Sequence, residues 1–189
     1  MRNARRLALV IGLVALASTP MACSGSSSDS GKGPTTTTTC PFDGTTKATT
    51  TPGGAGQTTS TLRTVTTQAS GCIDTMRWNF TPATPGASVH YDAGPFTDTA
   101  GQPITIEGAA LVVEFTGATI GNPGDPQAYS GPSTVAPNGL GHITRASLET
   151  TTSGNMAWVL DLDEQRPYAV RSEEHTSELQ SQFRISYAV

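Results

Sequence analysis

Residues 72–170 are expected to form one all-β domain, an antiparallel sandwich or barrel, and three observations predict it. Short runs in this region alternate apolar and polar residues, which is the period of a half-buried strand. Clusters of Gly, Pro, Asn and Asp separate the runs, and these residues favour turns. No stretch shows a sustained helical period. About a hundred residues is also the usual size of one domain.

The expected strands follow one another at short intervals. The first clear run places Met76, Trp78 and Phe80 on one side, with polar residues between them. The last does the same with Met156, Trp158, Leu160 and Leu162. Between them lie Val89-His90-Tyr91, Ile104-Thr105-Ile106, Leu111-Val112-Val113-Glu114-Phe115, and a run marked by Ile143, Ala146 and Leu148. Many short strands separated by turns are typical of a sandwich or a barrel.

Residues 1–22 have the pattern of a lipoprotein-type signal peptide. Met1–Arg6 carries three positive charges and no acid, and Leu7–Ala17 is apolar. A basic head, a short apolar run and small residues before the cleavage point are typical of a secretory signal. The run is shorter than the ~20 residues of a membrane-spanning helix, and no later stretch is long or apolar enough. We therefore expect an exported chain whose remainder lies outside the membrane.

Cys23 stands where a lipoprotein signal places its lipid-modified cysteine. Ala22 before it and Ser24-Gly25-Ser26 after it fit this role. Pro20 departs from it, because Leu is usual three residues before the cysteine. Two acyl chains suffice for stable anchoring, so we expect the protein at the outer face of the cell membrane. The alternative is ordinary cleavage nearby, which would leave Cys23 as a free thiol and the protein secreted.

Residues 23–71 are rich in Thr, Ser, Gly and Pro, as the run Thr35–Thr39 illustrates. A segment with so few apolar residues cannot bury enough surface to offset the entropy lost on ordering. We expect a disordered tether that lifts the domain off the membrane. Thr next to Pro is also compatible with O-linked sugar, although an unmodified linker is the simpler interpretation.

Cys40 and Cys72 are the cysteines that remain besides Cys23. An exported compartment permits disulfides. A bridge between them would close a loop of about thirty residues and contribute ~3–4 kcal/mol in the chain-entropy model. The rival role, two metal-ligating thiols, lacks the clustered ligands of a zinc site. We expect a disulfide between Cys40 and Cys72.

The tail, residues 171–189, changes character abruptly and is charged. Arg171–Ser181 matches, in order, the translated constant strand of a common short-read sequencing adapter. Ile185–Val189 matches the continuation of that adapter beyond its index, for which residues 182–184 leave the right gap. We therefore interpret residues 171–189 as adapter read-through and exclude them from the expected fold, as a fusion scar would be.

Several runs resemble the AMIN-like domain of lipoproteins from high-GC Gram-positive bacteria, in order and spacing, from about residue 72 to 170. They are Val89-His90-Tyr91, the run from Ile104 to Val113, Tyr129-Ser130-Gly131-Pro132, the run from Met156 to Asp163, and Arg166-Pro167-Tyr168-Ala169-Val170. Related AMIN domains are β-sandwiches that target envelope proteins, including cell-wall amidases and secretins, to the periplasm or wall. The resemblance thus implies a sandwich and an envelope role.

In that family one more strand usually follows the Arg-Pro-aromatic segment. With residues 171–189 set aside, we expect a truncated domain that lacks its last strand. A missing strand would leave an unpaired sheet edge, which is an aggregation hazard.

Residues that could carry chemistry are few. The chain has no Gly-x-Ser-x-Gly elbow, no His-Glu-x-x-His and no phosphate-binding Gly-rich loop. His90 falls in a strand, on its expected solvent face, and His142 in a turn, so neither is assigned a catalytic or metal role. Asp161-x-Asp163-Glu164 is compatible with a Ca²⁺ site, but a solvated turn before Arg166 is favoured. We expect no enzyme, no cofactor and no metal.

Charge restricts the partners of the domain. Residues 72–170 contain ten acidic and three basic residues, which is the opposite of a nucleic-acid binder. Polyanionic wall polymers are poor partners for the same reason. Tyr129 and Tyr168 are therefore the candidate binding residues, as the expected exposed aromatics, although packing against the sandwich edge is the alternative.

Three functions follow as hypotheses. The first is a non-catalytic cell-envelope module that binds peptidoglycan or positions a partner at the wall. The second is a protein–protein adaptor of an envelope machine without wall affinity. The third is an enzyme with an unfamiliar site, for which the sequence offers no convergent polar pocket.

Overall fold

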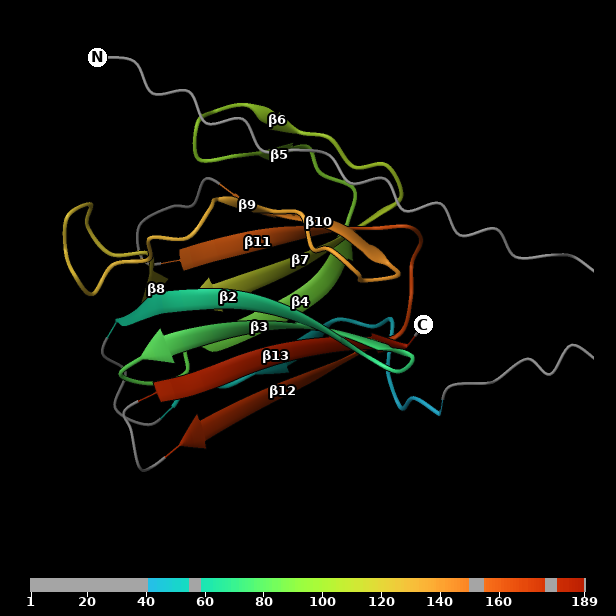
Figure 1. The fold of residues 1–189 in the computed structure, drawn as a ribbon, viewed down its shortest axis with the longest axis horizontal. Helices are drawn as coiled ribbons and strands as arrows, with labels where there is room; N and C mark the ends of the chain where they lie inside the picture. Colours follow the sequence, from blue (N-terminus) through green and yellow to red (C-terminus); the bar gives the residue numbers. More distant parts are fainter. Residues whose placement is uncertain (1–40, 55–58, 150–154, 176–179, 189) are drawn as a thin grey trace, which may run out of the picture. The chain divides into compact units, whose positions relative to one another are not determined.

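The computed structural model describes residues 41–54, 59–149, 155–175 and 180–188. In these ranges the chain forms two β-sheets packed face to face, with a short hairpin on the outer side of one of them (Figure 1). None of the described residues belongs to a helix that is long and apolar enough to cross a bilayer. The predicted all-β antiparallel sandwich is confirmed.

The six-stranded sheet is antiparallel throughout its described part. Its order is β1 (Thr49–Thr51), β4 (Gly86–Asp92), β7 (Ala109–Thr116), β11 (Asn155–Leu162), β10 (Ile143–Leu148) and β9 (Thr134–Val135). The β-branched and alternating residues of β4, β7 and β11 suit a pleated, half-buried surface. These central strands form the face on which the core is built.

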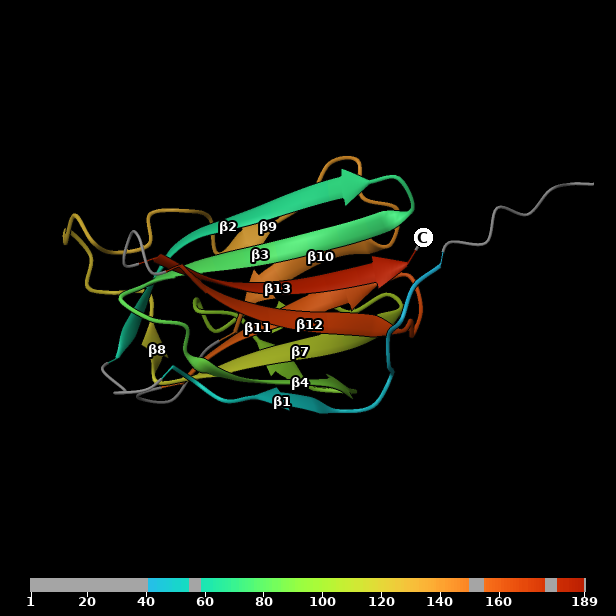
Figure 2. The same cartoon turned by 90° about the horizontal axis from the view of Figure 1, so that it is seen from below.

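The described part of the second sheet is five-stranded. Its order is β12 (Tyr168–His175), β13 (Gln180–Ala188), β3 (Ile73–Thr81), β2 (Ser60–Ser70) and β8 (Ala118–Thr119). All its pairs are antiparallel except β2 with β8, which is parallel. Figure 2 shows this sheet from its outer side, with β2 and β12 toward opposite edges.

The core lies between the two sheets, where the predicted alternation places it. Met76, Trp78 and Phe80 of β3 are fully buried against the other sheet. The inner residues of β11 are buried with them, and the Trp78 and Trp158 rings meet edge-on, 6.4 Å apart. Aromatic pairs in this geometry stabilise a core beyond the area they bury.

A second, smaller core covers the outer face of the six-stranded sheet. The hairpin of β5 (Phe96–Thr97) and β6 (Pro103–Ile104) lies over that face (Figure 1). Phe96 packs on Val112 and Val159, whose side chains point away from the main core. Because of this cover, β11 is buried on both faces from Met156 to Leu162, although its sequence predicts one buried side.

The ordered domain begins earlier than the predicted boundary at residue 72. Thr49–Thr51 and Ser60–Ser70, assigned above to a disordered tether, form β1 and β2. Thr is β-branched and favours strands even though it counts as polar. In β2, Leu62 is buried and Val65 packs against the core. These two apolar residues attach a Thr-rich strand to the core, and backbone pairing joins it to β3.

The tail is part of the sheet, contrary to its exclusion from the expected fold. Residues 171–175 extend β12, and β13 lies between β12 and β3. The physical reason is period-two patterning: Phe183, Ile185 and Tyr187 are buried at alternate positions of β13. The position after Arg166-Pro167, expected to lack a strand, is therefore occupied. The adapter origin of the codons stays a prediction, which resequencing the locus beyond Val170 tests.

The signal peptide, Cys23 and Cys40 lie outside the described residues, so the structure does not test the predictions that rest on them. Cys72 is half-buried in the turn between β2 and β3. Gly71 precedes it with φ of 61°, as in the first position of a type II′ hairpin turn. The lipid anchor and the disulfide between Cys40 and Cys72 both stay predictions.

Candidate functional site

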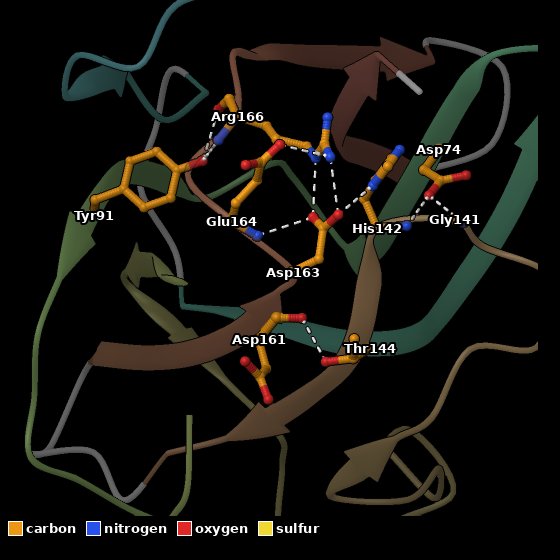
Figure 3. A network of polar contacts seen from close by, with 9 residues as sticks. All are labelled: Asp74, Tyr91, Gly141, His142, Thr144, Asp161, Asp163, Glu164 and Arg166. Carbon is orange, nitrogen blue, oxygen red and sulfur yellow. Dashed lines mark hydrogen bonds and ion pairs between the residues drawn. The ribbon is translucent and has the colours of Figure 1, made fainter. Parts of the chain in front are cut away.

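The densest group of polar contacts in the described residues lies where β11 ends and the chain turns toward β12 (Figure 3). Asp163 is at its centre. The Arg166 guanidinium donates from Nε to Oδ1 and from Nη2 to Oδ2 of Asp163, both at 2.9 Å. His142 Nδ1 lies 2.7 Å from the same Oδ2. Asp163 therefore faces a bidentate cation and an imidazole at once.

This arrangement sets the charge of Asp163. The hydrogen bonds from Arg166 hold the pKa of the Asp163 carboxyl well below its ordinary value, against the opposing effect of burial, and His142 adds to the lowering. The same pair raises the pKa of Arg166. Bidentate Arg–carboxylate pairs are among the stronger and more directional polar contacts. The turn after β11 is thus held by an ion pair at neutral pH.

Tyr91 attaches this turn to the six-stranded sheet. Its hydroxyl donates to the carbonyl of Arg166 at 2.6 Å and accepts from the Arg166 NH at 2.9 Å (Figure 3). Burial raises the pKa of Tyr91, so the hydroxyl keeps its proton for this bond. The end of β4 and the turn before β12 are therefore joined through one side chain.

Asp74 holds the neighbouring turn. This carboxylate is buried at the start of β3, and its Oδ2 accepts from the NH of Gly141 at 2.7 Å and of His142 at 3.0 Å. The two NH donors give a buried carboxylate the hydrogen bonds it requires. Asp74 thereby positions His142 against Asp163, and it connects the two sheets at this end.

Asp161 performs a similar role on the outer face. It is buried, and its Oδ1 accepts from the NH of Glu107 at 3.1 Å, while Oδ2 lies 3.2 Å from Arg145 Nη2. Gly108 follows Glu107 and packs closely against the main chain at the end of β11. A Cβ at this position would lie 2.1 Å from the Leu162 carbonyl oxygen. Asp161 thus fixes the approach of the segment after β6 to the end of β11.

A groove of about 490 Å³ opens beside these contacts. It is lined by Tyr91, Asp92, Ala93, Ile106, Gly108, Ala109, Ala110 and Gln165. Half of its lining residues are Ala or Gly, and Asp92 and Gln165 add one carboxylate and one amide. The volume is in the range of small-molecule sites, roughly 300–1,000 Å³. Two residues connect the groove to the polar network. Tyr91 lines the groove and bonds to Arg166, and Gln165 lies between Glu164 and Arg166 in the chain.

The arrangement favours binding and positioning over chemistry. Asp161 and Asp163 point to different arginines, and Glu164 Oε1 lies 2.8 Å from Arg166 Nη2. These carboxylates therefore neutralise guanidinium groups of the chain itself, which does not fit the alternative of a Ca²⁺ site. In the described residues, no group of three or more His, Cys, Asp and Glu could hold a metal ion.

His90 and His142, the two histidines considered in the sequence, have different partners. His90 is half-exposed on β4, with Nε2 3.9 Å from Asp92 Oδ2. His142 is mostly buried, and its Nε2 has no hydrogen-bond partner among the described residues. His142 is thus a structural member of the network, which its position in a Gly-rich turn did not indicate.

Tyr168 is not an exposed binding residue, and this prediction was wrong. Its side chain is fully buried. Its hydroxyl lies 2.6 Å from the carbonyl of Lys47 and 2.8 Å from that of Val89. The reason is that β12 begins at the core, so its first aromatic residue packs edge-on against Tyr91, 6.0 Å away.

Tyr129 is half-buried, and its contacts are those of packing. Its hydroxyl donates to the Pro132 carbonyl at 2.9 Å, and its ring meets Trp158 edge-on at 6.3 Å. A Cβ on Gly131 would lie 2.4 Å from the Tyr129 hydroxyl. The Tyr-x-Gly-Pro motif is therefore a self-closing loop, in which Gly leaves room for the ring. Burial raises the pKa of Tyr129 accordingly.

Fold and site together define a β-sandwich module whose polar residues build a turn network and a shallow groove. The chain belongs to the AMIN-like domain family, whose model matches residues 60–180. Such domains are envelope-associated modules of a non-catalytic kind. The match begins with β2 and includes β12, while β1 and nearly all of β13 lie outside it. No curated protein and no solved structure matches the chain.

Proposed function

We propose that this domain is a non-catalytic module of the cell envelope that binds cell-wall material, or positions a partner there, through the groove beside Tyr91. Family membership supports the envelope role. The signal-like N-terminus and Cys23 support export and lipid anchoring at the outer face of the cell membrane. The observation that carries the binding role is the groove, whose lining combines small apolar residues with a carboxylate and an amide.

The groove also restricts the ligand. Asp92 and Gln165 offer a carboxylate and an amide, while Ile106 and three alanines offer apolar contact. A neutral glycan or an amine-bearing peptide suits this set, because hydroxyl and ammonium groups can donate to these oxygens. Anionic polymers do not suit it. Uncrosslinked or crosslinked peptidoglycan, which combines sugar and peptide, is the material to test first.

The test is retention of the whole chain on purified peptidoglycan. The chain carries Cys23→Ala, so that no acyl group can cause sedimentation by itself. Ala93→Trp fills the groove from an exposed position and is expected to abolish retention. Ala100→Trp is the matched control: it places the same side chain at an exposed position in the turn between β5 and β6, and retention should be unchanged.

The adaptor role is the second candidate, and the same experiment separates the two. A wild-type chain that is not retained would reject wall binding. Crosslinking in cells should then trap one partner protein and no glycan, and Ala93→Trp should reduce that crosslink if the groove is the docking surface. Equal retention of both Trp variants would show that wall binding uses another surface.

A further inference from the structure

β2 lies at an edge of the five-stranded sheet, and most of that edge has no strand beside it (Figure 2). On its inner side β2 pairs with β3 as far as Ser70. On its outer side β8 pairs only with Ser60 and Thr61, and no other strand in the described ranges pairs with β2. Among the described residues, the outer edge of β2 therefore has no strand beside it over residues 64–70, beyond Arg63, whose guanidinium donates to the Gln127 carbonyl.

The register shows which groups the open edge presents. A two-residue turn joins β2 to β3 and places Ser70 opposite Ile73. The pair that flanks such a turn is a hydrogen-bonded pair, and hydrogen-bonded and non-hydrogen-bonded pairs alternate from there. The NH and C=O groups of Val65, Thr67 and Ala69 consequently point away from β3. Within the described ranges they form a row of donors and acceptors that no strand pairs with.

The other edges are protected in ways that β2 is not. Natural sheets protect edges with short strands, charges, Pro or bulges. β1 and β9 are three and two residues long. β12 is longer, but it carries Arg171 and Glu173, and Thr45 bridges to its first residue. In β2 the bulge lies at its start, between Leu62 and Thr64, and residues 64–70 contain no charge, no Pro and no Gly.

We propose that β2 pairs with β2 of a second copy of this chain, antiparallel, about a two-fold axis at Thr66. The two five-stranded sheets would then join into one continuous sheet. This goes beyond the proposed wall binding, since the groove lies beside β4 and β7 of the other sheet.

The sequence of β2 is compatible with its own antiparallel copy. In this register Thr66 faces Thr66 in a non-hydrogen-bonded pair, and Thr64 faces Gln68, both of which are exposed in the single chain. Thr–Thr pairs across strands are favourable. Arg63, the one charge in residues 60–70, faces Ala69, so no like charges meet. The two-fold axis also keeps the core-facing side chains of both copies on the same side.

Other occupants fit the open edge less well. An unrelated strand would have to match the length of β2 and its lack of charge. The β2 strand of a second copy has the same length and charge, because the two copies are identical. Backbone pairing over about seven residues buries less than the roughly 1,200 Å² of a standard stable interface. The proposed dimer is therefore a weak one that forms at high local concentration.

The test is sedimentation velocity of the whole chain, carrying Cys23→Ala, over a concentration series. The wild type should shift from monomer to dimer. Thr66→Lys places two ammonium groups opposite each other and should weaken the dimer about threefold to tenfold. Thr134→Lys is the matched control, because it adds the same charge at an exposed position of another edge strand, β9, and should leave association unchanged.

A mixing experiment tests the two-fold register. Chains with Thr66→Lys and chains with Thr66→Glu should each associate poorly alone, and should form a dimer when mixed. A chain that stays monomeric throughout would overturn the proposal, and so would a dimer that Thr66→Lys does not weaken. A monomer in which the amides of Val65, Thr67 and Ala69 resist hydrogen exchange would assign the edge to another segment of the same chain, and would also overturn it.

Discussion

Two buried tyrosines that face each other give the sharpest test of the packing described above. Tyr168 of β12 lies opposite Tyr187 of β13, and both side chains are fully buried. The Tyr168 hydroxyl lies within hydrogen-bond distance of the carbonyls of Lys47 and Val89. The Tyr187 hydroxyl has no partner among the described residues. The two side chains are thus equally buried but differ in the hydrogen bonding of their hydroxyl groups.

The substitutions Tyr168→Phe and Tyr187→Phe are expected to act in opposite directions. Tyr168→Phe removes a hydrogen bond worth about 1 kcal/mol net, so the free energy of unfolding should fall by about 0.5–1.5 kcal/mol. Tyr187→Phe removes a hydroxyl that is desolvated without compensation. It should leave the free energy of unfolding unchanged or raise it by up to about 1 kcal/mol.

The assay is equilibrium unfolding in urea, followed by the fluorescence of Trp78 and Trp158, which are fully buried. The midpoint should move while the slope m stays constant, since neither change alters the surface exposed on unfolding. Equal losses in both variants would refute the reasoning, because they would show that shape and not hydrogen bonding decides the cost. A neutral Tyr168→Phe would show that its two carbonyls find other donors.

Three further changes test the Tyr129 loop, the close approach at Gly108 and the ion pair of Asp163. Gly131→Ala should displace the Tyr129 ring, because the new Cβ would lie 2.4 Å from its hydroxyl, and cost about 1–3 kcal/mol in urea unfolding. Gly108→Ala should cost more, since its Cβ would meet the main-chain oxygen of Leu162 at 2.1 Å, which no side-chain rotation relieves; its thermal midpoint should fall below that of Gly131→Ala. Asp163→Asn should flatten the fall of stability in acid, measured by urea midpoints at several pH values.

The sign for Asp163 follows from its lowered pKa. A carboxyl whose pKa is lower in the folded than in the unfolded state stabilises the fold fully above the unfolded value, near pH 4. That contribution is lost as pH falls through the lower, folded value. The wild type should therefore lose stability below about pH 4 more steeply than Asp163→Asn. Exposure of the side chain reduces the size of the effect. Parallel profiles would contradict the ion pair with Arg166.

The core could be predicted from the sequence where apolar residues alternate. Met76, Trp78 and Phe80 were placed on one face by period alone, and all three are buried. The second buried face of β11 could not be predicted in this way. It exists because the hairpin of β5 and β6, about sixty residues earlier in the chain, folds over Val112 and Val159. Covering of this kind depends on tertiary contacts that a local pattern does not contain.

The candidate site was harder to predict than the core, for two physical reasons. Asp74 looks like a surface residue in the sequence, and its donors are 67 and 68 residues away. Tyr91 looks like one more strand residue, and its partner Arg166 is 75 residues away. The available signal was the acidic cluster at Asp161 and Asp163, which the sequence placed in a turn but could not connect to Arg145 or His142. The sequence did not predict β2, because its many Thr residues count as polar and obscure the alternation of apolar and polar positions.

The small number of residues that attach β13 to the core has a consequence for sequence divergence. Among the β13 side chains whose burial the structure describes, residues 182–187, only Phe183, Ile185 and Tyr187 are fully buried. Backbone pairing with β3 and β12 supplies the rest of the attachment. Backbone pairing does not depend on which side chains a strand carries. Many segments with three apolar residues at alternate positions could therefore occupy this place in the sheet. Relatives should therefore differ far more here than along β11, where both faces are packed and nearly every substitution meets a neighbour.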